Sequence, residues 1–552
     1  MLASAILNSA MRAPELPCLW AQKSGEWCSY SRGEVVDASG RLAHWLTAQG
    51  LHRGDRVLLL MENRPEWAVA ALACARLGCV LVPAYITHQD SEIRYLCEQT
   101  EPQMHIVSDA LSDRLLGAGV DPERTLCIVD QGEVLYPEQL GGTLDPEAPL
   151  PAADDLYALI ATSGTNGVPK IAMLSHGNIS SNVQSICQVL DDAGLLAPQR
   201  FLSFLPLAHA YEHMAGLHLP FAIGGEIFYC DRLDRLANDM QAIQPTLMTA
   251  VPRLYELLYQ KIQMQISQES RFKQWMFSRT LDLGGRDKKK LSYSERLLNA
   301  LCEQLVRKKV RRRFGGRLQY FVSGGAALNP QIARFFTSLG IGILQGYGQT
   351  EASPVISVNR PGQVRMETVG PALPGVEVKL GPENELLVRG DLIMQGYWNA
   401  AEDTAKVIQD GWLHTGDLAE IDPDGHIRIV GRVKDLIVNS GGENIAPAPI
   451  EQELVFHPDV EQAVLVGDGR PWLSALLVLT ETARESGRDQ ASIIRDILRA
   501  INADKPAYLQ IRKAVVLETP CTIENGLLTP THKIKRQRVM ALYQHEIEKI
   551  YR

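Results

Sequence analysis

The sequence predicts a large α/β protein built on parallel β-sheets, followed by a β-rich segment and a small α+β domain. Short runs rich in Val, Ile and Leu alternate with longer amphipathic segments, as at 56–61, 66–77 and 79–85. This alternation is typical of strand–helix–strand units whose sheet is covered by helices on both faces. After Tyr347 the apolar runs become shorter and are separated by Pro and Gly turns, which indicates a different, β-rich part.

Further buried strands are expected along the N-terminal part. They fall at 104–108, 225–229, 247–251 and 318–325. The segment 67–86 is mostly apolar, but Arg76, Gly78 and Pro83 interrupt it well before the ~20 apolar residues that a membrane helix needs. We therefore expect a buried helix, a glycine turn and a core strand in this segment.

The β-rich part is expected to contain strands at 376–380, 385–390 and 426–431. The last part of the chain, up to residue 552, has its own pattern of strands and helices, which predicts a boundary near 431–435. We expect an N-terminal domain at 1–431, made of two parallel-sheet α/β subdomains and a small β-rich subdomain. A small mobile α+β domain is expected at 432–552.

Composition narrows the classes of function. The 552 residues carry a net charge of -9, so the chain as a whole has no attraction for nucleic acid or for an anionic membrane. The ten cysteines are scattered without a Cys-x-x-Cys pair, which predicts free thiols in a reducing compartment and no zinc site. The N-terminus lacks a basic leader, so no export signal is expected and the predicted location is the cytoplasm.

One local exception to the acidic charge is the long, helix-favouring stretch at 258–313, which ends in Arg307-Lys-Lys-Val-Arg-Arg-Arg313. Its basic face could touch anionic lipid, which would make the protein peripheral on a membrane. A solvated helix on a protein surface is the simpler interpretation, because runs of charge usually have that role.

The stretch 159–170, Leu-Ile-Ala-Thr-Ser-Gly-Thr-Asn-Gly-Val-Pro-Lys, is the most informative part of the sequence. Two glycines let consecutive backbone N–H groups turn towards one anion, and three hydroxyl side chains with Lys170 add donors and a positive charge. The spacing differs from a Walker A loop, and both flanks look like strands. The stretch predicts a phosphate-binding loop, and a plain hairpin turn is the alternative.

Three further motifs occur in order, at 345–351 (Gln-Gly-Tyr-Gly-Gln-Thr-Glu), 411–417 (Gly-Trp-Leu-His-Thr-Gly-Asp) and 430–435 (Val-Gly-Arg-Val-Lys-Asp). With the loop at 159–170 they resemble the adenylate-forming, or AMP-binding, enzyme superfamily over nearly the whole chain. Within that superfamily the sequence is most similar to long-chain fatty acyl-CoA synthetases. This closer likeness depends on strings at 205–212, 251–256 and 524–530, and on the helical insertion before Phe314.

The resemblance implies roles for individual residues of the nucleotide site. Tyr347 would stack on adenine, Thr350 would reach the α-phosphate, and Glu351 would hold Mg2+ with Thr165 as a second metal ligand. Asp417 would accept hydrogen bonds from the ribose, while Arg432 would help to hold ribose or phosphate. The complete set implied for ATP or AMP is Thr162, Ser163, Gly164, Thr165, Asn166, Gly167, Gly325, Ala326, Gly346, Tyr347, Gly348, Asp417 and Arg432.

The catalytic set implied by the resemblance is Lys533, Glu351, Thr350 and Lys170. The family places a lysine in a Gly-Lys-Ile-x-Arg-like string, and the matching string here is Thr-His-Lys-Ile-Lys-Arg at 531–536. His532 stands where many members have Gly, so Lys535 remains an alternative to Lys533. The strings at 323–328 and 389–398 are also similar to the family.

The remaining implied residues concern the acid and the thiol. An acyl pocket is expected at His209, Tyr211, Met214 and Gly324, although nearby apolar side chains could equally be core. Lys434 matches the hinge of a rotating C-terminal domain. Gly441 and Gly442 match the loop presented to coenzyme A (CoA), and a plain hairpin is the alternative for these two glycines.

The reaction that the resemblance implies joins a carboxylic acid, most simply a fatty acid, to AMP with release of pyrophosphate and then to the CoA thiol. ATP, Mg2+ and CoA would be required. Three alternatives stay open: a fatty acyl-AMP ligase that loads a carrier-protein thiol, a ligase for a non-fatty acid, and an inactive nucleotide-binding protein. The sequence indicates neither the preferred acid nor an oligomeric state.

Overall fold

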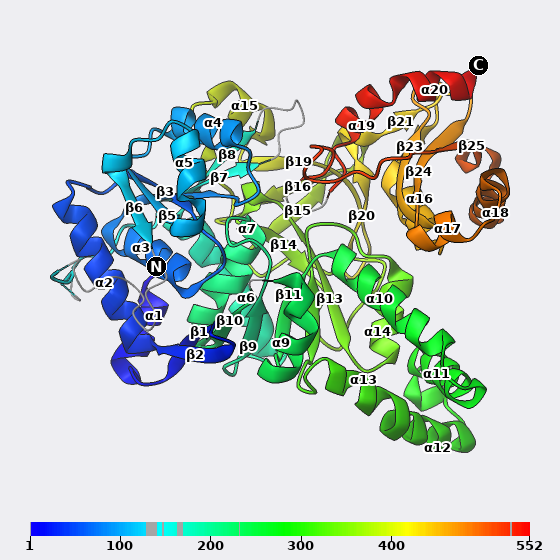
Figure 1. Ribbon diagram of the computed structural model, residues 1–552, viewed down its shortest axis with the longest axis horizontal. Coiled ribbons are helices and arrows are strands. Elements are labelled where there is room, and N and C mark those ends of the chain that lie inside the picture. Colours follow the sequence, from blue (N-terminus) through cyan, green and yellow to red (C-terminus); the bar gives the residue numbers. More distant parts are fainter. Residues whose placement is uncertain (1, 129–140, 146–147, 163–168, 231, 530–532) are drawn as a thin grey trace. The chain divides into compact units, whose positions relative to one another are not determined.

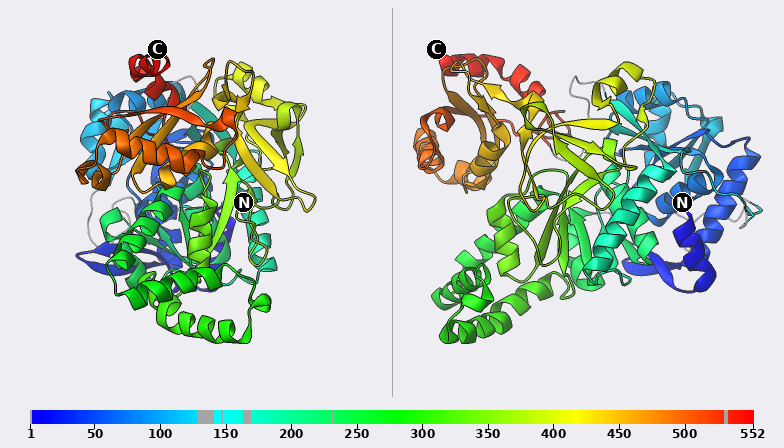
Figure 2. Two further views of the ribbon diagram at one scale, coloured as in Figure 1. Left: turned by 90° about the vertical axis from the view of Figure 1, so that its right-hand side faces the viewer. Right: turned by 180° about the vertical axis from the view of Figure 1, so that it is seen from behind.

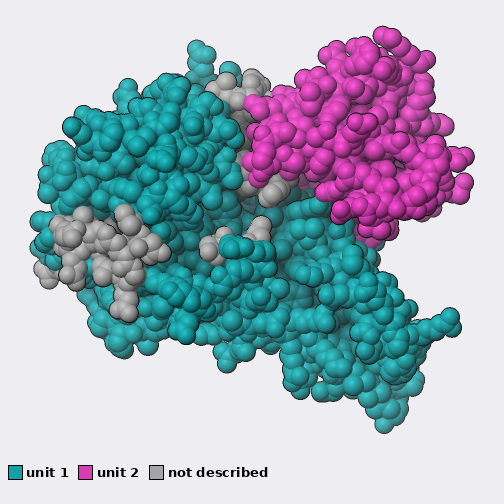
Figure 3. Space-filling view, viewed as in Figure 1, with its two compact units in different colours: residues 1–378, 388–413 teal, residues 379–387, 414–552 magenta. Residues whose placement is uncertain are grey.

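The computed structural model describes residues 2–128, 141–145, 148–162, 169–230, 232–529 and 533–552. Its contacts divide the chain into two compact units (Figure 3). Unit 1 comprises Met1–Val378 and Val388–Leu413, and unit 2 comprises Lys379–Leu387 and His414–Arg552. A division by contacts does not locate a hinge, so the boundary at 431/432 stays a prediction.

One sheet of unit 1 carries the phosphate-loop segment. In the described part of the chain its strand order is β17 (Gly396–Tyr397), β8 (Lys170–Ser175), β7 (Leu156–Thr162), β4 (Val80–Ala84), β3 (Arg56–Leu60), β5 (Met104–Ser108) and β6 (Thr125–Ile128). The strands from β7 to β6 run parallel, whereas β8 and β17 pair in the antiparallel sense. Helices α3 (Pro65–Leu77), α4 (Asp90–Thr100), α5 (Ser112–Gly117) and α6 (His176–Asp192) contact strands of this sheet, and α2 (Arg32–Ala48) packs on α3.

The other large sheet of unit 1 has the order β14 (Val355–Val358), β13 (Gly342–Gly348), β12 (Tyr320–Ser323), β11 (Leu247–Ala250), β9 (Arg200–Ser203), β10 (Glu226–Tyr229), β1 (Pro17–Lys23) and β2 (Glu26–Ser31). Its strands are parallel except at the two ends, where β14 and β2 are antiparallel. Helices α1 (Ser4–Arg12), α8 (Leu219–Ile223), α9 (Leu236–Ile243) and α14 (Pro330–Ser338) accompany it.

A helical arm leaves this half between β11 and β12. It consists of α10 (Pro252–Ser267), α11 (Arg271–Gly284), α12 (Tyr293–Cys302) and α13 (Lys308–Arg313). In the views of Figure 1 and Figure 2, α11 and α12 lie at the edge of unit 1, away from its sheets. The helix-favouring stretch predicted at 258–313 is therefore confirmed as helical.

The β-rich part forms a sheet of β15 (Glu377–Leu380), β16 (Glu385–Arg389), β19 (Trp412–Ile421) and β18 (Ile408–Gln409), with β20 (Ile427–Arg432) paired to β19 and α15 (Ala401–Val407) before β18. The last part of unit 2 has a two-stranded sheet, β21 (Ile437–Val438) and β22 (Asn444–Ile445), and a sheet of β23 (Val460–Val466), β24 (Leu473–Leu479) and β25 (Ile511–Val516). Its helices are α16 (Pro447–Phe456), α17 (Glu481–Glu485), α18 (Gln490–Asn502), α19 (Arg536–Leu542) and α20 (Gln544–Tyr551). The predicted fold class is confirmed.

Burial explains why the parallel strands are unbroken runs of apolar residues in the sequence. In β3, Val57 and Leu59 pack into one hydrophobic cluster while Leu58 and Leu60 pack into another, and all four are fully buried. Successive side chains of a strand point to opposite faces, so both faces of this strand are covered.

The segment 67–86 is also as expected, with α3 ending at Gly78 (φ 81°) before β4. No helix in the described ranges is long and apolar enough to cross a bilayer.

Ionisable side chains are buried in the core of unit 1, in α7 (Ala210–Glu212) and the π-helical turn His213–His218. The carboxylate of Glu212 accepts hydrogen bonds from Ser203 Oγ at 2.6 Å and Thr249 Oγ1 at 2.7 Å. Burial raises the pKa of Glu212 to about 7, although these two bonds oppose the rise. His213, the next residue, contacts Tyr157 Oη at 3.1 Å, and burial lowers its pKa to about 4.

The raised pKa of Glu212 predicts a pH-dependent cost in stability. Between about pH 4.5 and pH 7 the unfolded carboxyl loses its proton while the folded one keeps it, so the free energy of unfolding falls as pH rises. Glu212→Gln removes this titration, and its thermal midpoint should gain on the wild type across that window by the equivalent of ~3 kcal/mol. The exposed control Glu98→Gln should show no such trend, and parallel curves for wild type and Glu212→Gln would contradict the prediction.

Candidate functional site

The strands that flank the predicted phosphate loop are β7 and β8, an antiparallel pair in which Thr162 lies opposite Lys170. Thr162 Oγ1 donates a hydrogen bond to the carbonyl oxygen of Lys170 at 3.2 Å, which closes the base of the loop. The expectation of strands on both flanks is confirmed. The predicted loop residues Ser163, Gly164, Thr165, Asn166 and Gly167 lie outside the described residues.

Lys170, at the start of β8, has two neighbours that come from much later in the chain. Its Nζ lies 3.1 Å from Asp403 Oδ2 and 4.8 Å from the centre of the Tyr397 ring. Tyr397 reaches this position because β17 pairs with β8, with Tyr397 opposite Ala172. A cation over an aromatic face and beside a carboxylate is held in place, yet Lys170 stays 30% exposed and open to a phosphate.

Glu351 is bound to the hydroxyl of the same tyrosine. It lies in a short 3₁₀ turn, Thr350–Ala352, directly after β13, and its Oε1 accepts a hydrogen bond from Tyr397 Oη at 2.7 Å. Burial, with the neighbouring Glu351 carboxylate, raises the pKa of Tyr397, so its hydroxyl remains a donor. Tyr397 therefore joins the predicted phosphate-binding lysine to the predicted metal-binding carboxylate.

The side chain of Glu351 suits the Mg2+ role implied by the sequence. Its Oε2 accepts no hydrogen bond from the described residues, while Oε1 is oriented by Tyr397. Over the described ranges, no group of three or more His, Cys, Asp or Glu side chains forms a metal cluster. A single carboxylate is what Mg2+ needs from a protein when nucleotide phosphates and water supply its other ligands.

The glycines around Tyr347 have a structural reason to be glycine. A Cβ on Gly348 would lie 1.8 Å from the carbonyl oxygen of Pro354, and one on Gly346 would lie 3.1 Å from that of Ser357. Both contacts arise because β13 packs edge to edge with β14, with Tyr347 opposite Ser357. The two glycines thus allow the backbone of β14 to approach β13 closely on both sides of Tyr347.

Two of the predicted acyl-pocket residues are in contact. A Cβ on Gly324 would lie 3.0 Å from the Tyr211 ring, whose hydroxyl donates to the carbonyl oxygen of Val322 at 3.0 Å. His209 Nδ1 accepts a hydrogen bond from the backbone N–H of Tyr211 at 3.2 Å. Met214 is only 1% exposed and packs in the main core cluster, so it is a core residue in this structure. An acyl pocket lined by these residues stays a prediction.

Gly325 and Ala326 follow β12 and are exposed, and Gly325 has a positive φ of 83°. Their place directly after a parallel strand, with Tyr347 at the end of the adjacent strand β13, puts both at the carboxyl ends of neighbouring strands. Ligands of open α/β sheets commonly bind at such strand ends.

A second cluster of predicted site residues lies in unit 2. Asp417 in β19 is opposite Arg432 in β20, and Arg432 Nε donates to Asp417 Oδ1 at 2.8 Å. The Asp417 side chain is 6% exposed, whereas that of Arg432 is 53% exposed. The exposed guanidinium therefore fixes a buried carboxylate and still faces solvent.

Lys533 belongs to the same cluster. Its backbone closes a turn with Thr529, in which Lys533 N–H donates to Thr529 Oγ1 at 3.0 Å and Thr529 N–H donates to the Lys533 carbonyl at 2.8 Å. Lys533 as a residue is exposed, but its surroundings lower its pKa to about 8. The largest cause of this lower pKa is burial of the ammonium group. The positive charge of Arg432 lowers the pKa further, whereas the negative charge of Asp417 raises it. His532 lies outside the described residues.

The alternative lysine, Lys535, has a different setting. Its backbone N–H donates to the Leu527 carbonyl at 2.8 Å, and it is the residue that precedes α19. Lys434 lies in a 3₁₀ turn between β20 and β21, at the predicted hinge. Gly441 and Gly442 are exposed in the turn between β21 and β22, where both of their N–H groups bond to Asn439, so a hairpin is what this loop forms.

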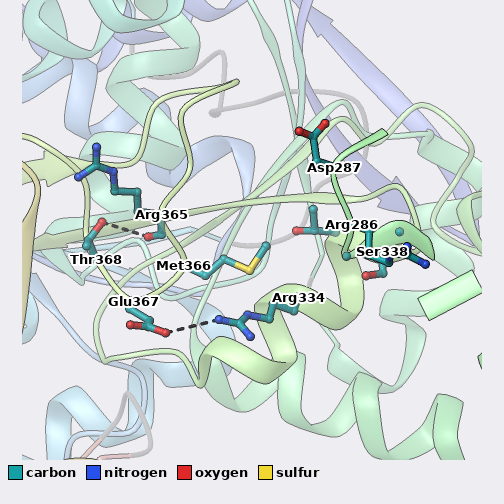
Figure 4. A pocket seen from close by; sticks show the side chains of 11 residues that line it. Arg286, Asp287, Arg334, Ser338, Arg365, Met366, Glu367 and Thr368 are labelled. Carbon is teal, nitrogen blue, oxygen red and sulfur yellow. Dashed lines mark hydrogen bonds and ion pairs between the residues drawn. The ribbon is translucent and has the colours of Figure 1, made fainter. Parts of the chain in front are cut away.

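A separate pocket of about 610 Å³ contains none of these residues (Figure 4). It lies between the end of α11, α14 and the loop after β14, and its lining is Gly284, Gly285, Arg286, Asp287, Arg334, Thr337, Ser338, Arg365, Met366, Glu367 and Thr368. Arg334 is bound to Glu367 at 3.4 Å within it. Arg286, another lining residue, is bound to Glu295 outside the pocket at 2.6 Å.

Two residues of the site were missed by sequence reasoning. Tyr397 lies in the string at 389–398, which is similar to the family, but that string gave no role to its tyrosine. Asp403 is in no motif, and its contact with Lys170 follows only from the pairing of β17 with β8. The tyrosine could have been found from the string, whereas nothing in the sequence marked the aspartate.

Comparisons with known proteins identify the family of the chain. The AMP-binding enzyme family matches residues 7–398, and the AMP-binding enzyme C-terminal domain matches residues 434–552. The chain therefore belongs to the AMP-binding enzyme family.

Among its curated relatives is the long-chain-fatty-acid--CoA ligase FadD15 of Mycobacterium bovis, 31% identical over 96% of this chain and 93% of the relative. The long-chain-fatty-acid--CoA ligase 5 of Rattus norvegicus is 28% identical over 97% of this chain and 86% of the relative.

Solved structures share the fold. ATP-bound MatB from Rhodopseudomonas palustris has a TM-score of 0.76 at 24% identity and covers 100% of both chains. A benzoate CoA ligase from Burkholderia xenovorans has a TM-score of 0.75 at 20% identity, covering 98% of this chain and 99% of that one.

Tyr397→Phe should weaken Mg2+-dependent binding of ATP. The variant keeps the ring beside Lys170 but leaves Glu351 without its oriented hydrogen bond, and a bond to a charged group is worth ~1.5–3 kcal/mol, which corresponds to about a tenfold or greater loss of affinity. Calorimetric titration with ATP, with and without Mg2+, measures this effect. Tyr551→Phe, which removes a partly buried tyrosine hydroxyl bound to the Val466 and Trp472 carbonyls in unit 2, is the control. An equal loss of ATP affinity with and without Mg2+ would contradict a role of Tyr397 in orienting Glu351 for the metal.

Proposed function

We propose that this protein is an ATP-dependent ligase that joins a long-chain fatty acid to CoA through an acyl-adenylate. The observation that carries the nucleotide chemistry is the contact of one side chain, Tyr397, with both Lys170 and Glu351. The proposed acid and thiol come from relatives that match nearly the whole chain and are named long-chain-fatty-acid--CoA ligases.

The first half-reaction makes the acid reactive. A carboxylate oxygen attacks the α-phosphorus of ATP, the bond to the β-phosphate oxygen breaks, and pyrophosphate leaves with the bonding electrons. Negative charge gathers on the phosphoryl oxygens, so fixed cations accelerate the step if they stabilise that charge more than the charge of bound ATP. Mg2+ held by Glu351 would supply part of this stabilisation.

We propose that Lys170 leaves its ion pair with Asp403 and binds a phosphate of ATP instead. Its ion pair with Asp403 is about one third exposed on each side, and pairs of that kind contribute little to stability. A phosphate carries more charge than a carboxylate and can displace it at small cost. Asp403 keeps a second partner in Lys406 at 3.1 Å, so its charge remains compensated when Lys170 turns away.

Asp417 and Arg432 are proposed to bind the ribose. A buried carboxylate that is held in place by Arg432 Nε is an acceptor that suits the paired hydroxyls of a ribose. Lys533 lies in the same charged cluster, and its ammonium group, whose pKa is lowered to about 8, would stabilise the charge that develops in adenylation.

The second half-reaction would transfer the acyl group from AMP to the CoA sulfur, with the thiol proton lost and AMP released. For this step we propose that the domain at 432–552 rotates about Lys434 and brings the turn with Gly441 and Gly442 to the thiol. Exposed glycines permit close approach of another backbone or ligand, and Gly442 has a positive φ of 84°.

Other acids and other thiols are the competing proposals. MatB and the benzoate CoA ligase share this fold, so the fold alone does not select a fatty acid. A carrier-protein thiol could replace CoA, and an inactive nucleotide-binding protein would form no adenylate. The charged residues proposed for adenylation are present and clustered within their units, which favours an enzyme.

Lys533→Ala should abolish adenylate formation but leave thioester formation from supplied acyl-AMP largely intact. The loss of a charge that acts only in the first transition state is expected to lower that rate by at least 100-fold. Pyrophosphate release measures the first step, and thioester formation from acyl-AMP and CoA measures the second. Lys535→Ala is the matched control and should retain both activities. An equal loss of both steps in Lys533→Ala would refute the assignment.

An acid panel tests the proposed substrate. With ATP, Mg2+ and CoA, pyrophosphate release should have a higher kcat/KM for long-chain fatty acids than for acetate, benzoate or malonate, because each buried methylene contributes ~0.8 kcal/mol. Product release should depend on free CoA. Preference for a short or aromatic acid would exclude the fatty-acid proposal, and AMP formation that ignores CoA would favour a carrier-protein thiol.

A further inference from the structure

The helical arm exposes an apolar stripe. In the run formed by α12, the π-helical turn Glu303–Arg307 and α13, the exposed fractions of Tyr293, Leu297, Leu301 and Leu305 are 87%, 60%, 49% and 46%. These residues are four apart, so each is displaced by about 40° from the one before and all lie along one side of the helix. Large apolar side chains repeated along a solvent-facing side require an explanation.

This stripe is not the side by which the helix packs on its own protein. The adjacent positions Leu298, Cys302 and Val306 make that contact, in a small core with Met276 and Leu283 of α11. The core is therefore complete without the stripe. The helix thus has two apolar sides, one buried within the arm and one left in water.

The segment that carries the stripe is also strongly basic. Residues 286–313 contain eleven Lys and Arg but three Asp and Glu, in a chain whose net charge is -9. Some of these cations are structural: Arg307 donates to the Ser338 carbonyl at 2.7 Å, and Arg311 pairs with Glu303. Others face solvent at the end of the stripe and form no ion pair with the described residues, namely Lys308, Lys309 and Arg312.

The neighbouring helix adds exposed aromatic rings. Phe272 and Trp275 of α11 are 65% and 47% exposed and stack on each other with centroids 6.2 Å apart. Aromatic rings of this kind favour the boundary between lipid headgroups and acyl chains. Together, the arm combines exposed leucines, exposed rings and unpaired cations on adjacent helices.

We propose that this basic apolar arm, residues 271–313, docks on the surface of an anionic lipid bilayer. The positive charge of the arm, together with its apolar stripe, favours an anionic bilayer over other partners. A second copy of the arm would bring two strongly positive surfaces together, and a nucleic acid would leave the leucines in water. A bilayer with anionic headgroups neutralises the cations and buries the apolar side chains in the same event. The proposal goes beyond the ligase activity and holds whatever acid is used.

Binding to vesicles tests the proposal with the full-length protein. Flotation should recover the protein with vesicles of phosphatidylcholine containing 30% phosphatidylglycerol, and much less with phosphatidylcholine alone. Lys308→Gln, Lys309→Gln and Arg312→Gln should each lower the partition coefficient about fivefold at low salt, the ratio that corresponds to ~1 kcal/mol per basic residue.

The matched charge control removes three exposed cations from unit 2, with Arg495→Gln, Arg499→Gln and Arg512→Gln. These variants should bind vesicles as the wild type does. Equal losses in both sets would mean that net charge alone drives binding, and the proposal for the arm would fail.

The apolar stripe has its own variant and control. The triple variant Leu297→Ser, Leu301→Ser, Leu305→Ser should lose at least tenfold in vesicle binding while keeping its thermal midpoint, because these side chains lie outside the core. Leu116→Ser and Leu542→Ser, at comparably exposed positions elsewhere, should change neither.

Sedimentation of the wild type and the triple variant tests the competing occupant. A dimer that forms only with the intact stripe, with no binding to anionic vesicles, would overturn the proposal in favour of a second copy. Unchanged vesicle binding in the triple variant would overturn it as well.

Discussion

The short pairing of β17 with β8 is the constraint on which the candidate nucleotide site depends. It places Tyr397 between Lys170 and Glu351, which otherwise come from different sheets and are separated by about 180 positions of sequence. The residues just before β17 add to this link, since Met394 N–H donates to the Glu351 carbonyl at 2.9 Å and Gln395 N–H donates to the Met173 carbonyl at 3.0 Å. The segment around this short strand thus fixes the position of Lys170 relative to Glu351, the carboxylate proposed to bind Mg2+, and phosphate chemistry requires such fixed positions.

Each unit carries its own group of charged residues. Lys170, Glu351 and Asp403 are in unit 1, whereas Asp417, Arg432 and Lys533 are in unit 2. Within each group the residues are already oriented by one another. Such internal support lets a group keep its geometry if the parts of the chain change their relative positions during a reaction with two chemical steps.

Much of the fold could be predicted from the sequence because parallel strands buried on both faces leave a simple signal. Val57 to Leu60 are all apolar since consecutive residues enter different cores. The motif residues were also identifiable, because Tyr347 and Glu351 lie at the end of a strand and just after it. Tyr397 was harder, since its position depends on a pairing between segments more than 200 residues apart, and Asp403 has no local signal at all.

The arm shows a further limit of pattern reading, and the reason is geometric. Leu297 and Leu298 are neighbours in an apolar helix, yet one is exposed and the other is packed, and only the position of α11 decides which. The charges of the chain are also unevenly distributed between the arm and the remainder. Because residues 286–313 are strongly basic while the rest of the chain is more acidic than its total of -9, an anionic surface attracts the arm and repels the remainder. The same electrostatics that weaken binding of the whole protein would orient it, arm first, on a bilayer.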